Sequence, residues 1–374
     1  SPDYHTAILY NNLAMSHGEQ GDLNKQLELL QKAIDLSTPQ TKKDSFYHAL
    51  FFHNLGYTYH SRGDFNEAVP HLEKGKQFWQ AVYGPEYFYL SYSYNALASC
   101  FSAKKAYHQA LLLYDKSKEI RIQNLGENHP LIASCINNIG LIHLQLKDYD
   151  KATAHFRAAK DIRLRQPSPN WPLVATYYQN IAVSHFYHSL DNPMYTDSVG
   201  KYFQRTQQIK ERYLPPLHPS HVSLLDWIGR HESQKGNFDT AQKNWDRALD
   251  MLHKMDLAHS RMATQIHYHK AQSREKDGQF DLAKKQIALG FQSLNIEPVF
   301  NEANLQNWVH SFSRDYLFLL ILAQAKIDFQ QYQQDKQLEN LKRARKHLQL
   351  ADMFTDQIRL EFSEIDRKSL SSQT

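Results

Sequence analysis

The sequence predicts an all-α protein, an α-solenoid (superhelix) of seven to eight similar helix pairs that repeat along the chain. Three features predict this fold. Small residues recur at a nearly constant interval, a turn follows most of them at a fixed distance, and a second pattern of small and large residues follows the turn. The composition, with 13 Gly, 13 Pro, 41% hydrophobic and 22% charged residues, is typical of a folded chain that is neither low-complexity nor disordered.

The first helix of each predicted unit contains a small residue, Gly or Ala, within an apolar segment. The small residues of successive units are 42 residues apart, except for one interval of 47 residues. The extra residues of that interval fall near residues 189–194, between the two helices of the fifth unit, where we expect them to lengthen a surface turn. The small residues with this spacing are Ala14, Gly56, Ala98, Gly140, Ala182, Gly229 and Ala271.

A turn and a second helix follow. Segments such as Gly63-Asp64-Phe65 end one helix and start the next. The second helix then carries small, large and small residues at i, i+4 and i+7, on one helix face. Small residues let helices approach and the large one fills the gap, so we expect Phe156 and Trp245 to be buried. The sets are Ala68/Leu72/Gly75, Ala110/Tyr114/Ser117, Ala152/Phe156/Ala159, Val199/Phe203/Thr206, Ala241/Trp245/Ala248 and Ala283/Ile287/Gly290, with Gln26/Leu30/Ala33 as a departure and Ala344/Leu348/Ala351 in a degenerate eighth unit.

These motifs resemble the tetratricopeptide repeat (TPR), which has Leu-Gly on its first helix and Ala-x3-Phe-x2-Ala on its second. The period is longer than the ~34 residues usual in that family. Together with the Leu125-Gly126-Glu127-Asn128-His129-Pro130 link, it resembles the repeats of kinesin light chains. The resemblance implies one superhelix over residues 1–353 and a C-terminal helix or linker over 354–374. Units are expected near residues 4–37, 44–83, 86–124, 130–166, 172–214, 219–255, 259–294 and 303–353.

In the family that this chain resembles, the first helices line a concave groove, where we expect a protein or peptide partner. When the small residue of each first helix is counted as position 8, positions 5 and 6 lie on the face away from the core. Half of these fourteen positions are Asn, whose amide both donates to and accepts from a peptide backbone. The same amides could instead be solvated or bond a neighbouring helix, so both interpretations stay open. The candidate groove residues are Asn11, Asn12, His53, Asn54, Tyr57, Tyr92, Asn95, Asn137, Asn138, Gln179, Asn180, Asp226, Trp227, Arg230, Tyr268 and His269.

Composition narrows the function further. The net charge of +4 is weak and dispersed, so we expect no nucleic-acid partner. The longest apolar run, residues 317–323, is far shorter than the roughly 20 residues of a membrane-spanning helix, so we expect no membrane contact. Two cysteines, Cys100 and Cys135, suit a reducing compartment, and we expect a cytoplasmic protein. Because no zinc or nucleophile motif is recognisable, we expect no metal, no cofactor and no enzymatic activity in this chain.

The C-terminal segment carries a second resemblance. Ala351-Asp352, followed by Asp356 and Ile358-Arg359, is similar to the region before the caspase-like protease domain of bacterial TPR–CHAT proteins. This resemblance implies that the chain is the sensor arm of such a protease, with the catalytic residues beyond Thr374. Because the sequence starts at Ser1 without Met, we expect it to be a piece of a longer protein. The alternatives are a stand-alone adaptor of the kinesin-light-chain type, closed by an amphipathic helix, and a peptide-pheromone receptor.

Overall fold

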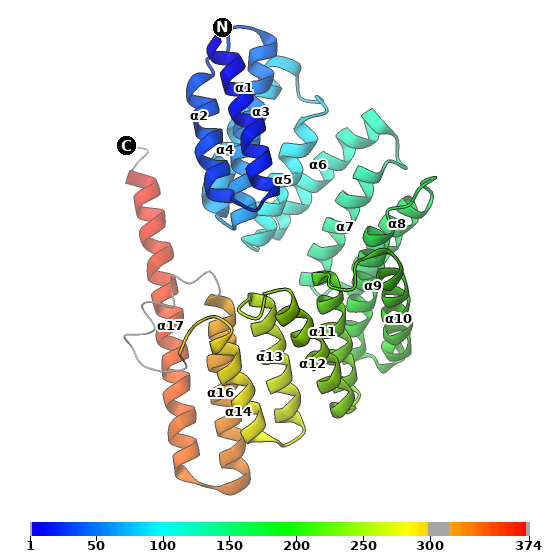
Figure 1. Cartoon of the computed structure of the whole chain (residues 1–374), viewed down its shortest axis with the longest axis vertical. Coiled ribbons are helices and arrows are strands. Elements are labelled where there is room, and N and C mark those ends of the chain that lie inside the picture. The colour runs from blue at the N-terminus through cyan, green and yellow to red at the C-terminus, as the bar shows by residue number, and fades with distance from the viewer. Residues whose placement is uncertain (1, 298–313, 372–374) are drawn as a thin grey trace. The chain divides into compact units, whose positions relative to one another are not determined.

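A computed structural model describes residues 2–297 and 314–371 of the chain. Every regular element in these residues is a helix, and successive helices pack as adjacent pairs (Figure 1). The predicted all-α fold of stacked helix pairs is therefore confirmed. The chain forms two compact units, Ser1–Thr196 and Asp197–Thr374, which are described one at a time.

The first unit alternates first and second helices along the chain. Each second helix packs against the first helix of its own pair and against the first helix of the next pair. Consecutive first helices also touch one another, and this row of helices carries many of the predicted groove residues. The first helices are α1 (Pro2–Glu19), α3 (Lys42–Arg62), α5 (Leu90–Ala103), α7 (Pro130–Gln145) and α9 (Trp171–Asp191), and the second helices are α2 (Leu23–Leu36), α4 (Phe65–Tyr83), α6 (Tyr107–Leu125) and α8 (Tyr149–Leu164).

The second unit continues the same alternation. Within it, α11 packs against α12, α13 against α14, and α16 against α17. The start of the predicted eighth unit, residues 303–313, lies outside the described residues. The helices are α10 (Thr196–Tyr213), α11 (Pro219–Gln234), α12 (Phe238–Lys254), α13 (Arg261–Lys276), α14 (Phe280–Gln292), α16 (Arg314–Asp335) and α17 (Leu338–Ser371).

One boundary differs from the expectation. The inserted residues of the fifth unit do more than lengthen a turn, because α9 extends to Asp191 and a short 3-10 helix, η1 (Pro193–Tyr195), follows it. Asn192 caps η1 by accepting the Met194 N–H at 3.2 Å. At the other end of the chain, α17 continues past residue 353 to Ser371, within the segment expected to be a C-terminal helix or linker. That segment contains neither Gly nor Pro, so it lacks the usual signals that end a helix.

The turn inside most pairs has one residue in the left-handed region of the backbone, the pair of α9 and α10 being an exception. Gly63 ends α3 with a φ of 92°, as the sequence pattern predicts. Lys105 and Lys147 take the same place in the next two pairs, with φ of 62° and 61°. A side chain in this conformation costs roughly 1–2 kcal/mol. The geometry of the turn is therefore kept even where the sequence does not supply Gly.

The pairing of small and large residues forms the contact between paired helices. Phe156 and Trp245 are 0% and 1% exposed, as expected from their spacing. Each large side chain lies over the Gly of the preceding helix. An added Cβ on Gly140 would lie 2.8 Å from the Phe156 ring, and one on Gly229 would lie 2.6 Å from the Trp245 ring. Leu348 breaks the pattern because it is 50% exposed, so its position in the last unit is not a core position.

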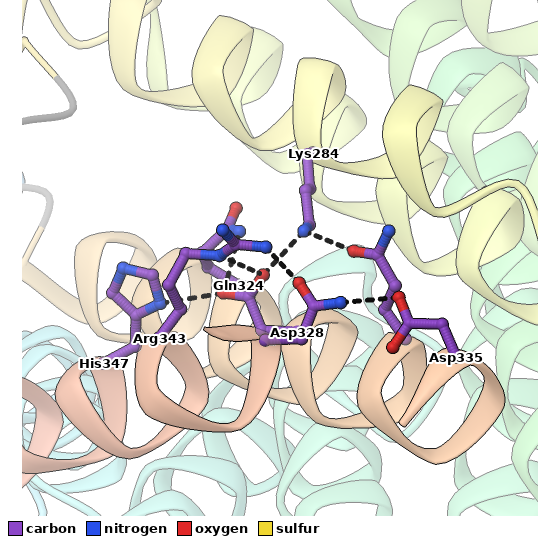
Figure 2. A network of polar contacts seen from close by, with 8 residues as sticks. Lys284, Gln324, Asp328, Asp335, Arg343 and His347 are labelled. Carbon is purple, nitrogen blue, oxygen red and sulfur yellow. Dashed lines mark hydrogen bonds and ion pairs between the residues drawn. The ribbon is translucent and has the colours of Figure 1, made fainter. Parts of the chain in front are cut away.

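A buried carboxylate joins the last helices of the second unit. Asp328 on α16 lies 2.7 Å from Lys284 Nζ on α14 and 3.0 Å from His347 Nδ1 on α17 (Figure 2). Arg343 lies 3.7 Å away, and Gln324 donates a hydrogen bond at 3.2 Å. Burial by itself would raise the pKa of Asp328, but hydrogen bonds from His347 and Lys284 hold it below its usual value. Since an unpaired buried charge is costly, this cluster ties α14, α16 and α17 together.

Candidate functional site

The predicted groove amides hydrogen-bond to one another across neighbouring first helices. Asn54 Nδ2 on α3 donates to Asn11 Oδ1 on α1 at 2.8 Å. Asn180 Nδ2 on α9 donates to Asn137 Oδ1 on α7 at the same distance. In both pairs, position 6 of one first helix bonds position 5 of the first helix before it. We call these contacts the ladder bonds, and they correspond to the helix-bonding interpretation of the recurring Asn.

The same register recurs in the second unit with different chemistry. His269 Nδ1 on α13 lies 2.7 Å from Asp226 Oδ1 on α11. Asp226 is buried and also accepts hydrogen bonds from Trp245 Nε1 at 2.9 Å and Gln265 Nε2 at 3.0 Å. Burial by itself would raise the pKa of Asp226, but His269 and Arg230 hold it below its usual value. A charged hub thus replaces the amide pair at this ladder bond.

The candidate residues differ in how much surface they offer to a ligand. Position 5 was expected on the face away from the core, but Asn11 and Asp226 are 6% and 3% exposed because they face the neighbouring first helix. Tyr57 is 53% exposed, and Asn12 is exposed as well. The remaining candidates are half-buried: His53, Asn54, Tyr92, Asn95, Asn137, Asn138, Gln179, Asn180, Trp227, Arg230, Tyr268 and His269.

Three first helices of the first unit, α5, α7 and α9, are almost free of charged residues. Neither α5 nor α7 contains Asp, Glu, Lys or Arg, and α9 contains only Asp191, its last residue. Neutral contacts link this row of helices, as between His53 Nδ1 and Ser93 Oγ at 3.4 Å. Chemically, this surface offers neutral donors, neutral acceptors and Tyr rings, which suits hydrogen bonding to uncharged groups.

The first helices of the second unit are charged and aromatic instead. The Arg230 guanidinium lies 3.8 Å from the centre of the Trp227 ring, and Arg261 lies 5.0 Å from that of Tyr316. Tyr268 accepts a hydrogen bond from Gln272 Nε2 at 2.8 Å. The structure therefore brings the late candidates together on two consecutive first helices, α11 and α13, around the Asp226 hub.

One recurring polar position escaped the sequence analysis. It lies four residues after the last small residue of the second-helix signature, at Trp79, Arg121, Arg163 and Lys210. Trp79 Nε1 donates to the Phe46 carbonyl at 3.2 Å. Arg121 Nη1 donates to the Leu131 carbonyl at 3.0 Å, and Lys210 Nζ donates to the Ser220 carbonyl at 2.7 Å. The sequence could have indicated this position, because the repeat period places a hydrogen-bond donor at the same point of four units. Trp79, Arg121 and Lys210 thus bind backbone near the start of a first helix, whereas Arg163 Nη2 donates to the Ser134 side-chain Oγ at 3.3 Å. All four side chains therefore tie a second helix to a first helix.

Ion-binding clusters and membrane-spanning helices are two kinds of site that would be visible among the described residues. Within residues whose side chains are described, no three or more His, Cys, Asp or Glu side chains come together as ligands for an ion. None of the described helices is both long and apolar enough to span a bilayer.

Family models of the tetratricopeptide repeat match two parts of the sequence. One model matches residues 47–123, 105–165 and 132–189, and another matches residues 6–38. Together with the helix pairs and their small-large contacts, these matches confirm that the chain contains tetratricopeptide repeats. The sequence matches no curated protein.

Solved structures of helical repeat proteins resemble the fold. The apo form of RapI is 16% identical, with a TM-score of 0.58 over 77% of this chain and 97% of that chain. A Rap protein complexed with competence and sporulation factor is 12% identical, with a TM-score of 0.59 over 95% and 88%. BtubC (BKLC) from P. vanneervenii is 18% identical, with a TM-score of 0.52 over 63% and 92%. At these identities the similarity extends to the fold alone.

Proposed function

We propose that this chain is a protein- or peptide-binding scaffold, and that the row of first helices in its first unit is the binding surface. The supporting observation is that α5, α7 and α9 are almost free of charged residues and that α3 carries its charged residues only at its two ends. A side-chain amide has two N–H donors and an acceptor oxygen, and the ladder bond uses one donor of Asn54 and one of Asn180. The other donor and the oxygen can pair with the backbone of an extended peptide.

Aromatic side chains add contact area beside these amides. Tyr57 is exposed on α3, and Tyr92 is half-buried on α5. Tyr is enriched at binding hot spots because it contributes a large, rigid surface together with a hydroxyl. The similar fold of the Rap protein complexed with competence and sporulation factor supports a role in binding, although it assigns no residue here.

Selection from a random peptide display library against the full chain, followed by fluorescence anisotropy, tests the proposal. Asn12→Ala with Tyr57→Ala removes two exposed side chains from the first-helix face, and we expect selected peptides to bind at least about tenfold more weakly. The matched control is Gln77→Ala with Leu112→Ala, exposed positions on the second helices α4 and α6, and it should leave affinity unchanged. Equal losses in both double variants would contradict the proposed surface.

We further propose that the scaffold regulates a CHAT-type caspase-like protease encoded in the same gene. The supporting observation is that α17 continues from the last helix pair through the Asp352 and Asp356 segment without a break. A continuous helix of this kind can couple the repeats to a following domain. The test is the gene sequence downstream of the codon for Thr374. A caspase-like domain there would support the regulatory role, whereas a stop codon would favour a stand-alone adaptor.

A further inference from the structure

The helix α1 exposes two large apolar side chains on the face that points away from the rest of the first unit. Leu9 and Leu13 are 66% and 48% exposed. Thr6 precedes Leu9 by three residues, Ser16 follows Leu13 by three, and both are exposed as well. Residues three and four apart are neighbours on a helix surface, so these four side chains form one row, which we call the α1 stripe.

The same row is buried in every other first helix of the first unit. The α1 stripe occupies positions 0, 3, 7 and 10 of the count that makes Ala14 position 8, and in α3, α5, α7 and α9 no residue at these positions is more than 9% exposed. The second helix of the preceding pair covers them there. Ser117 Oγ of α6 lies 3.5 Å from Cys135 Sγ of α7, and Thr153 Oγ1 of α8 donates to Ser184 Oγ of α9 at 2.9 Å. The repeat therefore defines the α1 stripe as a helix-packing surface, and no helix in the described part of the chain covers it.

The composition of the α1 stripe makes it complementary to itself. It reads hydroxyl, Leu, Leu, hydroxyl at spacings of three, four and three residues, so the order is the same in both directions. Two antiparallel stripes therefore place Leu9 opposite Leu13 of the second copy and Thr6 opposite Ser16 of the second copy. The helix contains neither Lys nor Arg, and its two acidic residues lie near its ends, so two stripes meet without like-charge repulsion. An interface between identical copies about a two-fold axis requires this self-complementarity.

We propose that the α1 stripe binds a second copy of this chain, with the two α1 helices antiparallel about a two-fold axis midway between Leu9 and Leu13. The leucines of the second copy then cover the row that a second helix covers in the later units. A contact of one helix per copy is at or below the about 1,200 Å² that separates weak from stable complexes, so the dimer should dissociate on dilution. The dimer does not depend on the proposed peptide binding, because the α1 stripe faces away from α3.

Sedimentation velocity of the full chain over a wide range of concentrations tests the dimer. We expect a dimer at high concentration that dissociates reversibly on dilution. Leu9→Asn with Leu13→Asn replaces exposed side chains by polar ones of similar size, so this variant should fold normally and associate at least about tenfold more weakly. The matched control is Leu112→Asn with Leu282→Asn, exposed leucines of α6 and α14, and it should associate as the unmodified chain does. A monomer at every concentration, or equal weakening in both double variants, would overturn the proposal.

Disulfide cross-linking tests the antiparallel alignment. The native cysteines are both buried and should not compete. Residues 9 and 13 of different copies lie opposite each other in this alignment, whereas two residues 9 are offset by about 6 Å along the helices. A mixture of Leu9→Cys and Leu13→Cys chains, one of them enlarged by a tag, should therefore cross-link between unlike chains several-fold faster than either variant does with itself. Leu112→Cys, an exposed cysteine outside the stripe, is the control for random collision. Cross-linking of Leu9→Cys with itself as fast as in the mixture would overturn the antiparallel dimer.

Discussion

Gly140→Ala measures how tightly the paired helices α7 and α8 pack. In an open helix position the change stabilises by about 0.8–1.0 kcal/mol, since Gly is the poorer helix former. Here the added Cβ would lie 2.8 Å from Phe156 Cε1 and 3.1 Å from His155 Cβ. Phe156 is fully buried and cannot turn outward, and overpacking of this kind costs about 1–3 kcal/mol. The expected net effect is a destabilisation of up to about 2 kcal/mol.

The assay is hydrogen exchange of the α7 and α8 amides, because repeat arrays open locally and a single unfolding midpoint averages over units. Exchange in both helices should accelerate in Gly140→Ala. Adding Phe156→Leu removes the ring atoms that the new methyl meets. The double variant should therefore lose less stability than the two single variants lose in sum. Gly200→Ala is the control, because the nearest atom to its added Cβ is 3.9 Å away. If Gly140→Ala slows exchange as Gly200→Ala does, the packing argument is refuted.

Three further predictions concern other buried groups. Trp245→Ala should destabilise α11 and α12 by about 3–5 kcal/mol in urea unfolding, and a loss below about 1 kcal/mol would show that the ring is not a core element. The folded-state pKa of Asp328 is lowered, so its contribution is present above the unfolded pKa and lost as pH falls through the folded pKa. Protection factors of the α16 and α17 amides, which correct for the intrinsic pH dependence of exchange, should fall over that acid range, and Asp328→Asn should remove this fall. Burial lowers the pKa of Lys210 from 10.5 to about 8, so stability should rise between those pH values, by at most about 3 kcal/mol, and Lys210→Met should abolish the rise.

The repeat pattern was sufficient to predict which helix faces pack together. A fixed interval between Gly140 on one helix and Phe156 on the next reports directly that the two meet, because the contact needs a small and a large residue in register. The left-handed conformation of Lys105 was not predictable from its own identity, since only the neighbouring helices impose it. At Leu348 the pattern predicted a core residue that the structure does not have. The residue type matches the pattern, but no helix covers this position.

Whether the side chain at position 5 faces solvent was harder to predict than which residues form the core. A helical wheel tells which residues share a face, but whether that face meets solvent or the next pair depends on the angle between successive pairs. Asn11 and Asp226 lie where first helices touch, so they are buried although the wheel places them away from the core. A cavity of about 200 Å³ between α10, α11 and α12 has a similar origin, because it depends on how the side chains of these three helices fit together. No spacing within one helix reports such a fit.

The two kinds of ladder bond have different consequences for the surface around them. A buried carboxylate such as Asp226 requires compensating partners, and His269, Trp245 and Arg230 gather around it. An amide pair such as Asn11 and Asn54 satisfies itself without any counter-charge. First helices joined by an amide pair therefore need no charged residue at the contact, as between α7 and α9, where the only charged residue is Asp191 at the end of α9. This way of joining helices is compatible with the neutral face that we propose as the peptide-binding surface.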